Sequence, residues 1–223
     1  LIWGLFTARK KEFKPYSTIL IRYYIDALPL AEILHQKLVS KKMNVILRSI
    51  SNPTNEKNFY ICSDSKQRKF MPAGEKEFYE NLDGNIYLHA PASLTHLKDV
   101  DPKRITESIV ARKPIREILD KREENGNFGW TLCTMPTADL AKQAKLSIKD
   151  YTDQIARACF LNEKDPVKKW QQIFKDSLKI KKWLNALPVK TFNIQTKSMD
   201  LEIELGEKRK FMGVSGHNIP SFE

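Results

Sequence analysis

The chain has 223 residues and a mass of 25.9 kDa, with 41% hydrophobic and 29% charged residues. This composition is typical of an ordinary soluble globular protein and excludes a disordered chain. No apolar run approaches the roughly 20 residues that a membrane span requires. We therefore expect one large domain, or one domain and part of another, with no membrane partner.

The charge balance raises the question of nucleic acid. Lysine and arginine number 38 against 27 aspartate and glutamate, which gives a net charge of +11. Excess positive charge attracts phosphate backbones. The basic residues, however, form short pairs such as Lys168-Lys169, acidic residues interrupt them, and no nucleic-acid motif accompanies them. The pattern is typical of a lysine-rich solvated surface, and we expect no nucleic-acid partner.

The three cysteines are Cys62, Cys133 and Cys159, which lie far apart and form no CxxC pair. Their number and spacing fit neither a zinc ribbon nor a disulfide framework. Reduced, buried thiols in a cytoplasmic protein are the expected case.

The first 134 residues read as alternating strands and helices. The opening 1–10 looks like a helix cut at its N-terminal side, and Pro114 should interrupt the long helical stretch that opens at Asp101-Pro102. Such alternation predicts an α/β fold with a mostly parallel sheet flanked by helices. Strands are expected at 18–24, 44–50, 85–89 and 129–134, the last of them central, and helices at 28–38, 55–62, 75–82 and 101–124.

Two further helices follow. Ser147 and Asp150 resemble a capping box before a helix to about 160, and Asp165-Pro166 opens another to about 184. The second helix carries an apolar stripe broad enough to pack against neighbours on more than one side. We also expect three tryptophans, one in the 129–134 strand and two on this helix, to be core residues: Trp130, Trp170 and Trp183.

After Pro188 the hydrophobic period changes from helical to alternating. Strands are expected at 191–195 and 199–205, where Leu201, Ile203 and Leu205 alternate with glutamates, the pattern of a half-buried strand. We place a domain boundary here. Residues 1–187 form the α/β domain, and residues 188–223 are the first strands of a β-rich second domain.

The chain ends in a loop-like segment, residues 213–223, rich in Gly, Ser, Asn and Pro. Its last residue, Glu223, is a hard carboxylate of the kind that Mg, Mn or Zn centres accept. One carboxylate cannot hold a catalytic metal, because such sites use three or more protein ligands. A carboxylate on a strand edge is the competing interpretation. For His217 we favour a hydrogen bond that shapes the loop.

Two histidines follow the third expected strand. His89 stands at the strand end, where open α/β sheets place ligand clefts, and His96 lies seven residues later. Loop packing or a backbone hydrogen bond is favoured over metal ligation for both, because no acid or cysteine nearby in the sequence completes a cluster.

Several segments, taken in order, resemble one known family, the thermophilic metalloaminopeptidases of the aminopeptidase T and aminopeptidase S group. The similarity covers most of the chain and rests on the shared order of the segments. They are Ala27-Leu-Pro-Leu-Ala-Glu32, Ala90-Pro-Ala-Ser-Leu-Thr-His96, Ala111-Arg-Lys-Pro-Ile-Arg116, Trp130-Thr-Leu-Cys-Thr-Met-Pro-Thr137, Ala158-Cys-Phe-Leu161 and Gly216-His-Asn-Ile-Pro-Ser-Phe-Glu223.

The resemblance implies an enzyme that removes N-terminal residues from peptides with two neighbouring divalent metals, zinc, cobalt or manganese. It also implies an α/β N-terminal domain, a β-rich catalytic domain and a homodimer. In that family the residue aligned with Glu223 is a metal ligand, and the other ligands lie beyond it. We therefore expect the chain by itself to be inactive and not to bind the metal pair.

Two alternatives come from other functional classes. Because the chain lacks GxGxxG, GxxxxGK[ST], HExxH and GxSxG motifs, it also fits a non-catalytic α/β scaffold, a dimerisation module or a ligand-binding module. A nucleic-acid binder is the weaker third possibility.

Overall fold

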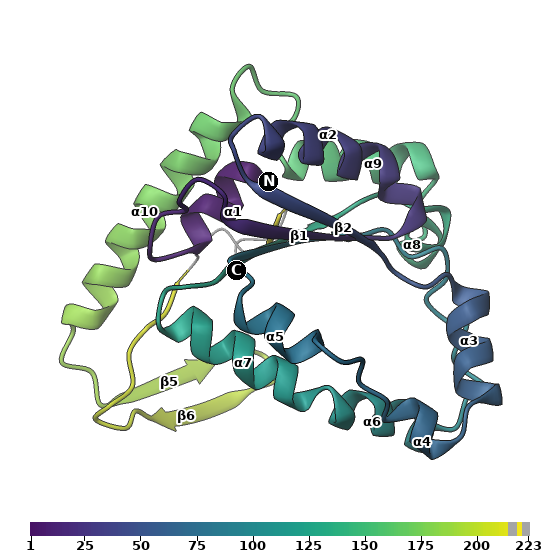
Figure 1. The fold of residues 1–223 in the computed structure, drawn as a ribbon. Coiled ribbons are helices and arrows are strands. Elements are labelled where there is room, and N and C mark those ends of the chain that lie inside the picture. The colour runs from purple at the N-terminus through teal and green to yellow at the C-terminus, as the bar shows by residue number, and fades with distance from the viewer. Residues whose placement is uncertain (214–217, 220–223) are drawn as a thin grey trace.

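The computed structural model describes residues 1–213 and 218–219. Strands and helices alternate along the chain, as Figure 1 shows. The helices are α1 Ile2–Ala8, η1 Ile25–Ala27, α2 Leu28–Val39, α3 Pro53–Cys62, α4 Ser65–Arg68, α5 Glu75–Glu80, α6 Pro102–Ala111, α7 Lys113–Glu124, α8 Ala138–Gln143, α9 Ile148–Ala158 and α10 Pro166–Ala186. The strands are β1 Thr18–Tyr23, β2 Asn44–Ser49, β3 Gly84–His89, β4 Gly129–Thr134, β5 Thr191–Gln195, β6 Asp200–Glu204 and β7 Asn218–Ile219.

Five strands form one parallel sheet in the order β2-β1-β3-β4-β7. The predicted α/β class is confirmed, and β4 lies inside the sheet as expected. β5 and β6 form a separate antiparallel pair. The domain boundary near 188 falls between α10 and β5 and stays a prediction, while Asn218–Ile219 of the C-terminal part pair with β4.

Two layers of helices cover the sheet (Figure 1). On one face α1 and α2 pack on Ile19, Ile21 and Leu88. On the other face α5 and α7 pack on Leu20 and the partly buried Trp130. Alternate residues of β1 therefore enter two different cores, which is why this strand reads as an apolar run. In β3 only the face that carries Ile86 and Leu88 joins a core cluster.

Local sequence signals set several helix boundaries. Asn52 caps α3 through a 2.8 Å bond from the Asn55 amide, so this helix begins two residues before the expected start. Pro114 interrupts the long helix as predicted, and it occupies the first turn of α7, where its missing N–H leaves no helical bond unmade. Asp165 caps α10 through the Lys168 amide at 3.0 Å.

The first half of α10 packs on the remainder of the molecule. Trp170 is 7% exposed and shares a core cluster with Cys159 and Ile219, and the Phe174 ring meets Trp3 edge-on at 6.2 Å. We call residues 1–177, together with 218–219, the body. Residues 178–213, which comprise the second half of α10 and the β5–β6 hairpin, are the arm.

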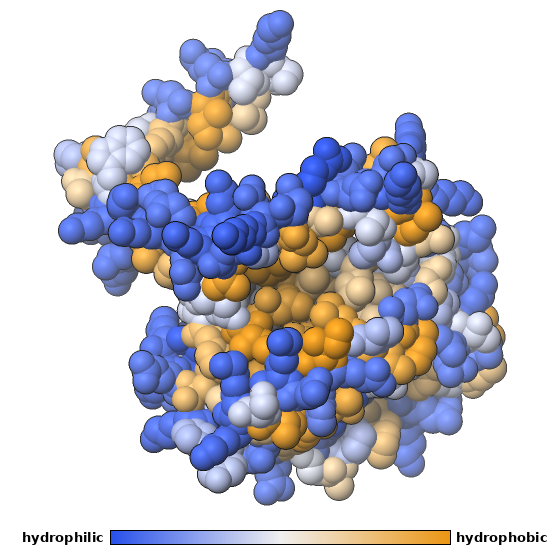
Figure 2. Space-filling model, turned by 90° about the horizontal axis from the view of Figure 1, so that it is seen from above, coloured by the Kyte–Doolittle hydropathy of each residue, from blue (hydrophilic) through white to orange (hydrophobic). Residues whose placement is uncertain are grey.

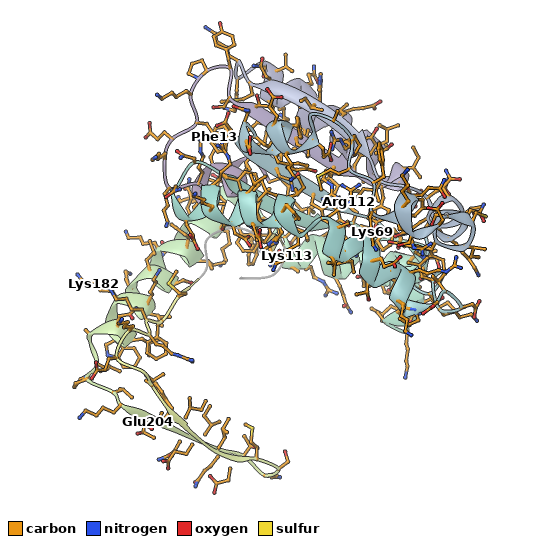
Figure 3. All side chains as sticks on the ribbon, turned by 60° about the horizontal axis from the view of Figure 1, so that its bottom comes forward. Phe13, Lys69, Arg112, Lys113, Lys182 and Glu204 are labelled. Atoms are coloured by element: carbon orange, nitrogen blue, oxygen red, sulfur yellow. The ribbon has the colours of Figure 1, made fainter. Side chains whose placement is uncertain are left out.

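The arm projects from the body (Figures 2 and 3). Figure 3 shows Lys182 and Glu204 on it, apart from Lys69 and Arg112 on the body. Two hydrogen bonds of 2.9 Å between the Asn185 side chain and the Phe211 backbone tie its end to α10. Many of its apolar side chains are nevertheless exposed: Leu178, Ile180, Trp183, Leu187, Ile194, Met199, Leu201 and Met212. Phe192 and Phe211 are half-buried and pack edge-on with ring centroids 5.5 Å apart.

Three burial predictions are wrong, and a fourth holds only in part. The broad stripe of α10 is not covered on several sides, and Trp183 is 60% exposed because the described residues place no second layer over this half of the helix. The half-buried pattern predicted for 199–205 holds only in part: Ile203 and Leu205 are half-buried, whereas Leu201 is 41% exposed, since the hairpin packs on no third strand. Cys62 is exposed at the end of α3, whereas Cys133 and Cys159 are buried as predicted.

Candidate functional site at the carboxyl ends of β1 and β3

The strand order marks one position in the sheet where a ligand site is expected. After β1 the chain crosses to β2 on one side, whereas β3 and β4 follow on the other side. A switch point is the place in an open parallel sheet where the connections from two adjacent strands run in opposite directions. Ligands bind at the carboxyl ends of the strands at such a point. The carboxyl ends of β1 and β3 meet at this point, with α3 beyond them (Figure 1).

Four polar and aromatic residues, which we call the β1–β3 quartet, lie at these ends: Arg22, Tyr24, Tyr87 and His89. Arg22 and Tyr87 are register partners in the two strands. Two residues farther along the chain, His89 is the last residue of β3 and Tyr24 directly follows the last residue of β1. Side chains two residues apart share a face of a sheet. Arg22, Tyr87 and His89 therefore lie on the face that α5 and α7 cover, beyond the apolar core around Leu20. Tyr24, just past the end of β1, also packs against the core on the α1 and α2 face.

The quartet is held together by ring contacts. The Tyr24 and Tyr87 hydroxyl oxygens are 3.4 Å apart. The His89 ring centroid lies 5.7 Å from that of Tyr24 and 5.8 Å from that of Tyr87. The Arg22 guanidinium stands 5.5 Å from the Tyr87 ring centroid, within range of a cation–π interaction. His89 therefore packs against two aromatic side chains, and one of them, Tyr24, belongs to the segment that follows β1.

Burial changes the titration of two members of the quartet. Burial, followed by the hydrogen bond with Tyr24, raises the pKa of Tyr87, so its hydroxyl stays protonated around neutral pH. Burial lowers the pKa of His89, so its ring is neutral there. The quartet thus presents one positive charge, on Arg22, together with neutral hydroxyl and imidazole donors.

His96 and Glu56 form a second polar pair next to the quartet. His96 Nε2 lies 2.8 Å from Glu56 Oε2, and Nδ1 lies 3.1 Å from the Ser93 carbonyl oxygen. Both contacts are hydrogen bonds only when both ring nitrogens carry protons, because both partners are acceptors. The predicted backbone bond of His96 is confirmed. α3 brings Glu56 to His96 from 40 residues away, an acidic neighbour that its place in the sequence does not reveal.

Two bonds connect the loops that follow β3 and β4. Thr137 Oγ1 donates to the Pro91 carbonyl at 2.8 Å, and it accepts from the Leu140 amide as the N-cap of α8. Asp139 accepts from the Leu94 amide at 2.6 Å. The 90–96 and 130–137 segments are therefore held side by side at the carboxyl edge of the sheet, beside the quartet.

Sequence reasoning singled out His89 but missed Arg22, Tyr24 and Tyr87. A signal was present, since Arg22 is a charged residue directly before the last residue of a mostly apolar strand, and Tyr87 stands two residues before the end of β3. What the sequence lacked was the register that makes these two residues neighbours. Glu56 gave no signal, because it stands on a helix with no buried residue.

The proposed metal ligand Glu223 lies outside the described residues, as does His217. Within residues 1–213 and 218–219, no group of three or more His, Cys, Asp or Glu side chains is placed to hold a metal ion. His96 and Glu56 supply two such groups, fewer than a catalytic centre uses. The described part of the chain therefore does not fit a metal centre. In the same part, no helix is long and apolar enough to cross a membrane.

Comparisons with known proteins agree with this architecture. A search of curated proteins gave no match. Among solved structures, the chain is similar to wild-type AmpT from Thermus thermophilus with a TM-score of 0.74 and 14% sequence identity. The match covers 99% of this chain and 58% of AmpT, so the chain spans less than two thirds of that protein. The family model described as thermophilic metalloprotease (M29) matches residues 4–223. The chain therefore belongs to the thermophilic metalloprotease (M29) family.

Proposed function

We propose that this chain is the N-terminal portion of a two-metal-dependent aminopeptidase that hydrolyses N-terminal residues from peptides. The observation that carries the proposal is the family match over residues 4–223. Membership of a metalloprotease family supports peptide hydrolysis that depends on divalent metal. Cleavage at the N-terminus and a pair of zinc, cobalt or manganese ions are the finer parts of the proposal.

The chain alone is proposed to be inactive. It spans 58% of the length of AmpT, and its described residues offer no cluster of three metal-binding side chains. Glu223 is the residue proposed to bind metal, as a carboxylate ligand that also neutralises part of the metal charge. The body would then act as the scaffold that carries this ligand.

The proposed working form is a homodimer in the cytoplasm that acts on peptides and binds neither nucleic acid nor a membrane. The exposed apolar side chains of the arm support an association of this kind. The free thiols Cys62, Cys133 and Cys159 are consistent with a reducing compartment.

The first test is an assay of the 223-residue chain on Leu-p-nitroanilide with zinc, cobalt or manganese. We expect no release of p-nitroaniline above that of the metal alone. Turnover comparable to that of AmpT would contradict the proposed inactivity of this portion.

The second test uses the protein encoded by the complete reading frame that contains this sequence. We expect metal-dependent hydrolysis of Leu-p-nitroanilide that EDTA abolishes and that Glu223→Gln reduces by at least about 100-fold, the scale of losing an electrostatic group at a reacting centre. A derivative of the same substrate with an acetylated amine should resist cleavage. Hydrolysis of that blocked substrate at the same rate would overturn the aminopeptidase assignment.

A further inference from the structure

Arg22 differs from the other arginines of the body. Among the described residues its guanidinium makes no hydrogen bond or ion pair, and it lies over the face of the Tyr87 ring. Every other body arginine has a hydrogen-bonding or ion-pairing partner: Arg9, Arg48, Arg68, Arg104, Arg112, Arg116, Arg122 and Arg157. Arg22 is also exposed, so its fork of N–H donors is open to a ligand.

The surroundings of Arg22 add directional donors. Tyr24 and Tyr87 bring two hydroxyl groups within 3.4 Å of each other, so one of them can donate to the other and still leave a proton for a ligand. His89 closes the group with a half-buried ring that packs on both tyrosines. These donors come from adjacent residues of two central strands, which hold them more rigidly than a loop would.

The charge of the site selects the type of anion. Arg22 supplies a single positive charge, and the neutral His89 ring adds none. The negative charge of Glu56 acts on Tyr87 and contributes to its raised pKa, so the site borders on an acid. One guanidinium beside one carboxylate favours a monoanion over a doubly charged phosphate. A carboxylate fits the planar guanidinium fork through two parallel hydrogen bonds.

We propose that Arg22, Tyr24, Tyr87 and His89 form a binding site for the α-carboxylate of a short peptide or a free amino acid. The guanidinium pairs with the carboxylate, and a tyrosine hydroxyl donates to one of its oxygens. The site lies at the switch point of the sheet, where such folds bind ligands. Naming peptides as carriers of the carboxylate rests on the proposed function. The carboxylate chemistry itself rests on the quartet alone.

Nuclear magnetic resonance of the 223-residue chain in EDTA tests the site without any hydrolysis. The probes are Leu-Gly-Gly, its C-terminal amide and free leucine, and the signals are those of the His89 ring and of Tyr24 and Tyr87. We expect Leu-Gly-Gly to shift these signals saturably and the amide to bind at least about tenfold more weakly, because a hydrogen bond to a charged group is lost. Equal affinity for acid and amide would overturn the proposal.

Variants locate the interaction. Arg22→Gln should weaken Leu-Gly-Gly binding by at least about tenfold, whereas Arg22→Lys, which keeps the charge without the fork, should lose less. The matched control is Arg116→Gln, which removes an exposed arginine paired with Asp120 on α7 and should leave the affinity unchanged. Circular dichroism checks that each variant is folded. A folded Arg22→Gln protein with undiminished affinity would refute the assignment.

The comparison of Leu-Gly-Gly with free leucine separates the two sources of the carboxylate. Tighter binding of Leu-Gly-Gly than of leucine identifies a subsite for peptide substrates, and the reverse identifies a subsite for a released amino acid; both support the proposal. The absence of binding by either acid contradicts it. Binding is measured without metal. A complete protein without aminopeptidase activity would therefore contradict the proposed function but would not affect the binding measurement.

Discussion

The body and the arm carry similar apolar periodicity but differ in what covers it. In the body, alternate residues of β1 enter two cores, and Leu88 of β3 has no exposed surface. In the arm, many apolar side chains of α10 and of the β5–β6 hairpin face solvent, and Leu178 is 45% exposed. Figure 2 shows apolar residues on the surface of the projecting arm.

The difference shows that a hydrophobic period identifies side chains that share a face, and leaves open whether a second layer covers that face. A helix or a sheet buries its apolar face only when a second layer of helices or strands packs on it. Each face of the parallel sheet has its own helices, whereas the β5–β6 hairpin has two strands and no further layer among the described residues. A two-stranded hairpin is marginally stable by itself. The stability of the chain should therefore reside in the body.

Truncation of one leucine in each region is the strongest test of this contrast. Leu88→Ala should lower the free energy of unfolding by about 2–5 kcal/mol, because it opens a cavity in a fully packed core. Leu178→Ala should lower it by less than about 1 kcal/mol, since that side chain already has large contact with water. Urea denaturation followed by circular dichroism measures both. Comparable losses would show that the arm is packed as tightly as the body.

Two glycines provide a smaller and independent comparison. A Cβ at Gly129 of β4 would lie 2.8 Å from the Cβ of Arg9 and 3.1 Å from its backbone nitrogen, so Gly129→Ala should destabilise the chain by about 1–3 kcal/mol. A Cβ at Gly206 in the arm meets nothing within 4 Å. Gly206→Ala should change stability by less than about 0.5 kcal/mol. A tolerated alanine at position 129 would mean that α1 shifts easily on the sheet.

Most of the body could be predicted from the sequence because its local signals agree with its tertiary structure. The β4 strand was predicted at its observed bounds, and Pro114 divides the long helix as expected. Short helices without an apolar stripe, such as α4, gave no periodic signal. The prediction that Trp183 is a core residue is wrong because helical spacing identifies residues on one face of α10, whereas burial requires another segment that packs on that face.

The candidate site was only partly predictable. His89 was identified from its place at a strand end. Arg22 and Tyr87 become neighbours only through the parallel register of β1 and β3, which the sequence does not encode in any short pattern. Glu56 reaches His96 across 40 residues through the placement of α3. Pairings over such distances follow from the topology, so they become visible only when the strand order is known.

Tryptophan fluorescence gives a gentler test of the same contrast. Trp183 of the arm is exposed, whereas Trp170 is buried and donates a 3.3 Å hydrogen bond to the Cys159 carbonyl. Trp183→Phe should remove much of the emission that acrylamide quenches and change stability by no more than about 0.5 kcal/mol. Trp170→Phe should leave the quenchable part largely intact and destabilise the chain. Protection of Trp183 from acrylamide in a monomeric sample would show that another segment covers the arm.

The smallest expected effect is a change of stability with pH. It distinguishes the body from the arm, because the arm contains no histidine. Burial lowers the pKa of His89 in the folded state below its ordinary value. The unfolded chain then binds the proton first as the pH falls, so this contribution to stability is present above about pH 6.5 and is lost as the pH drops through the lower, folded pKa. Nuclear magnetic resonance should show a His89 midpoint below 6.5, and urea unfolding of the wild-type chain should weaken more between pH 7 and pH 5 than that of His89→Gln. The difference between the two proteins isolates this ring from the carboxylates that titrate in both. A titration midpoint of His89 at the ordinary value of histidine would mean that water reaches the quartet freely. In exposure to solvent, the carboxyl ends of β1 and β3 would then resemble the arm more than the body.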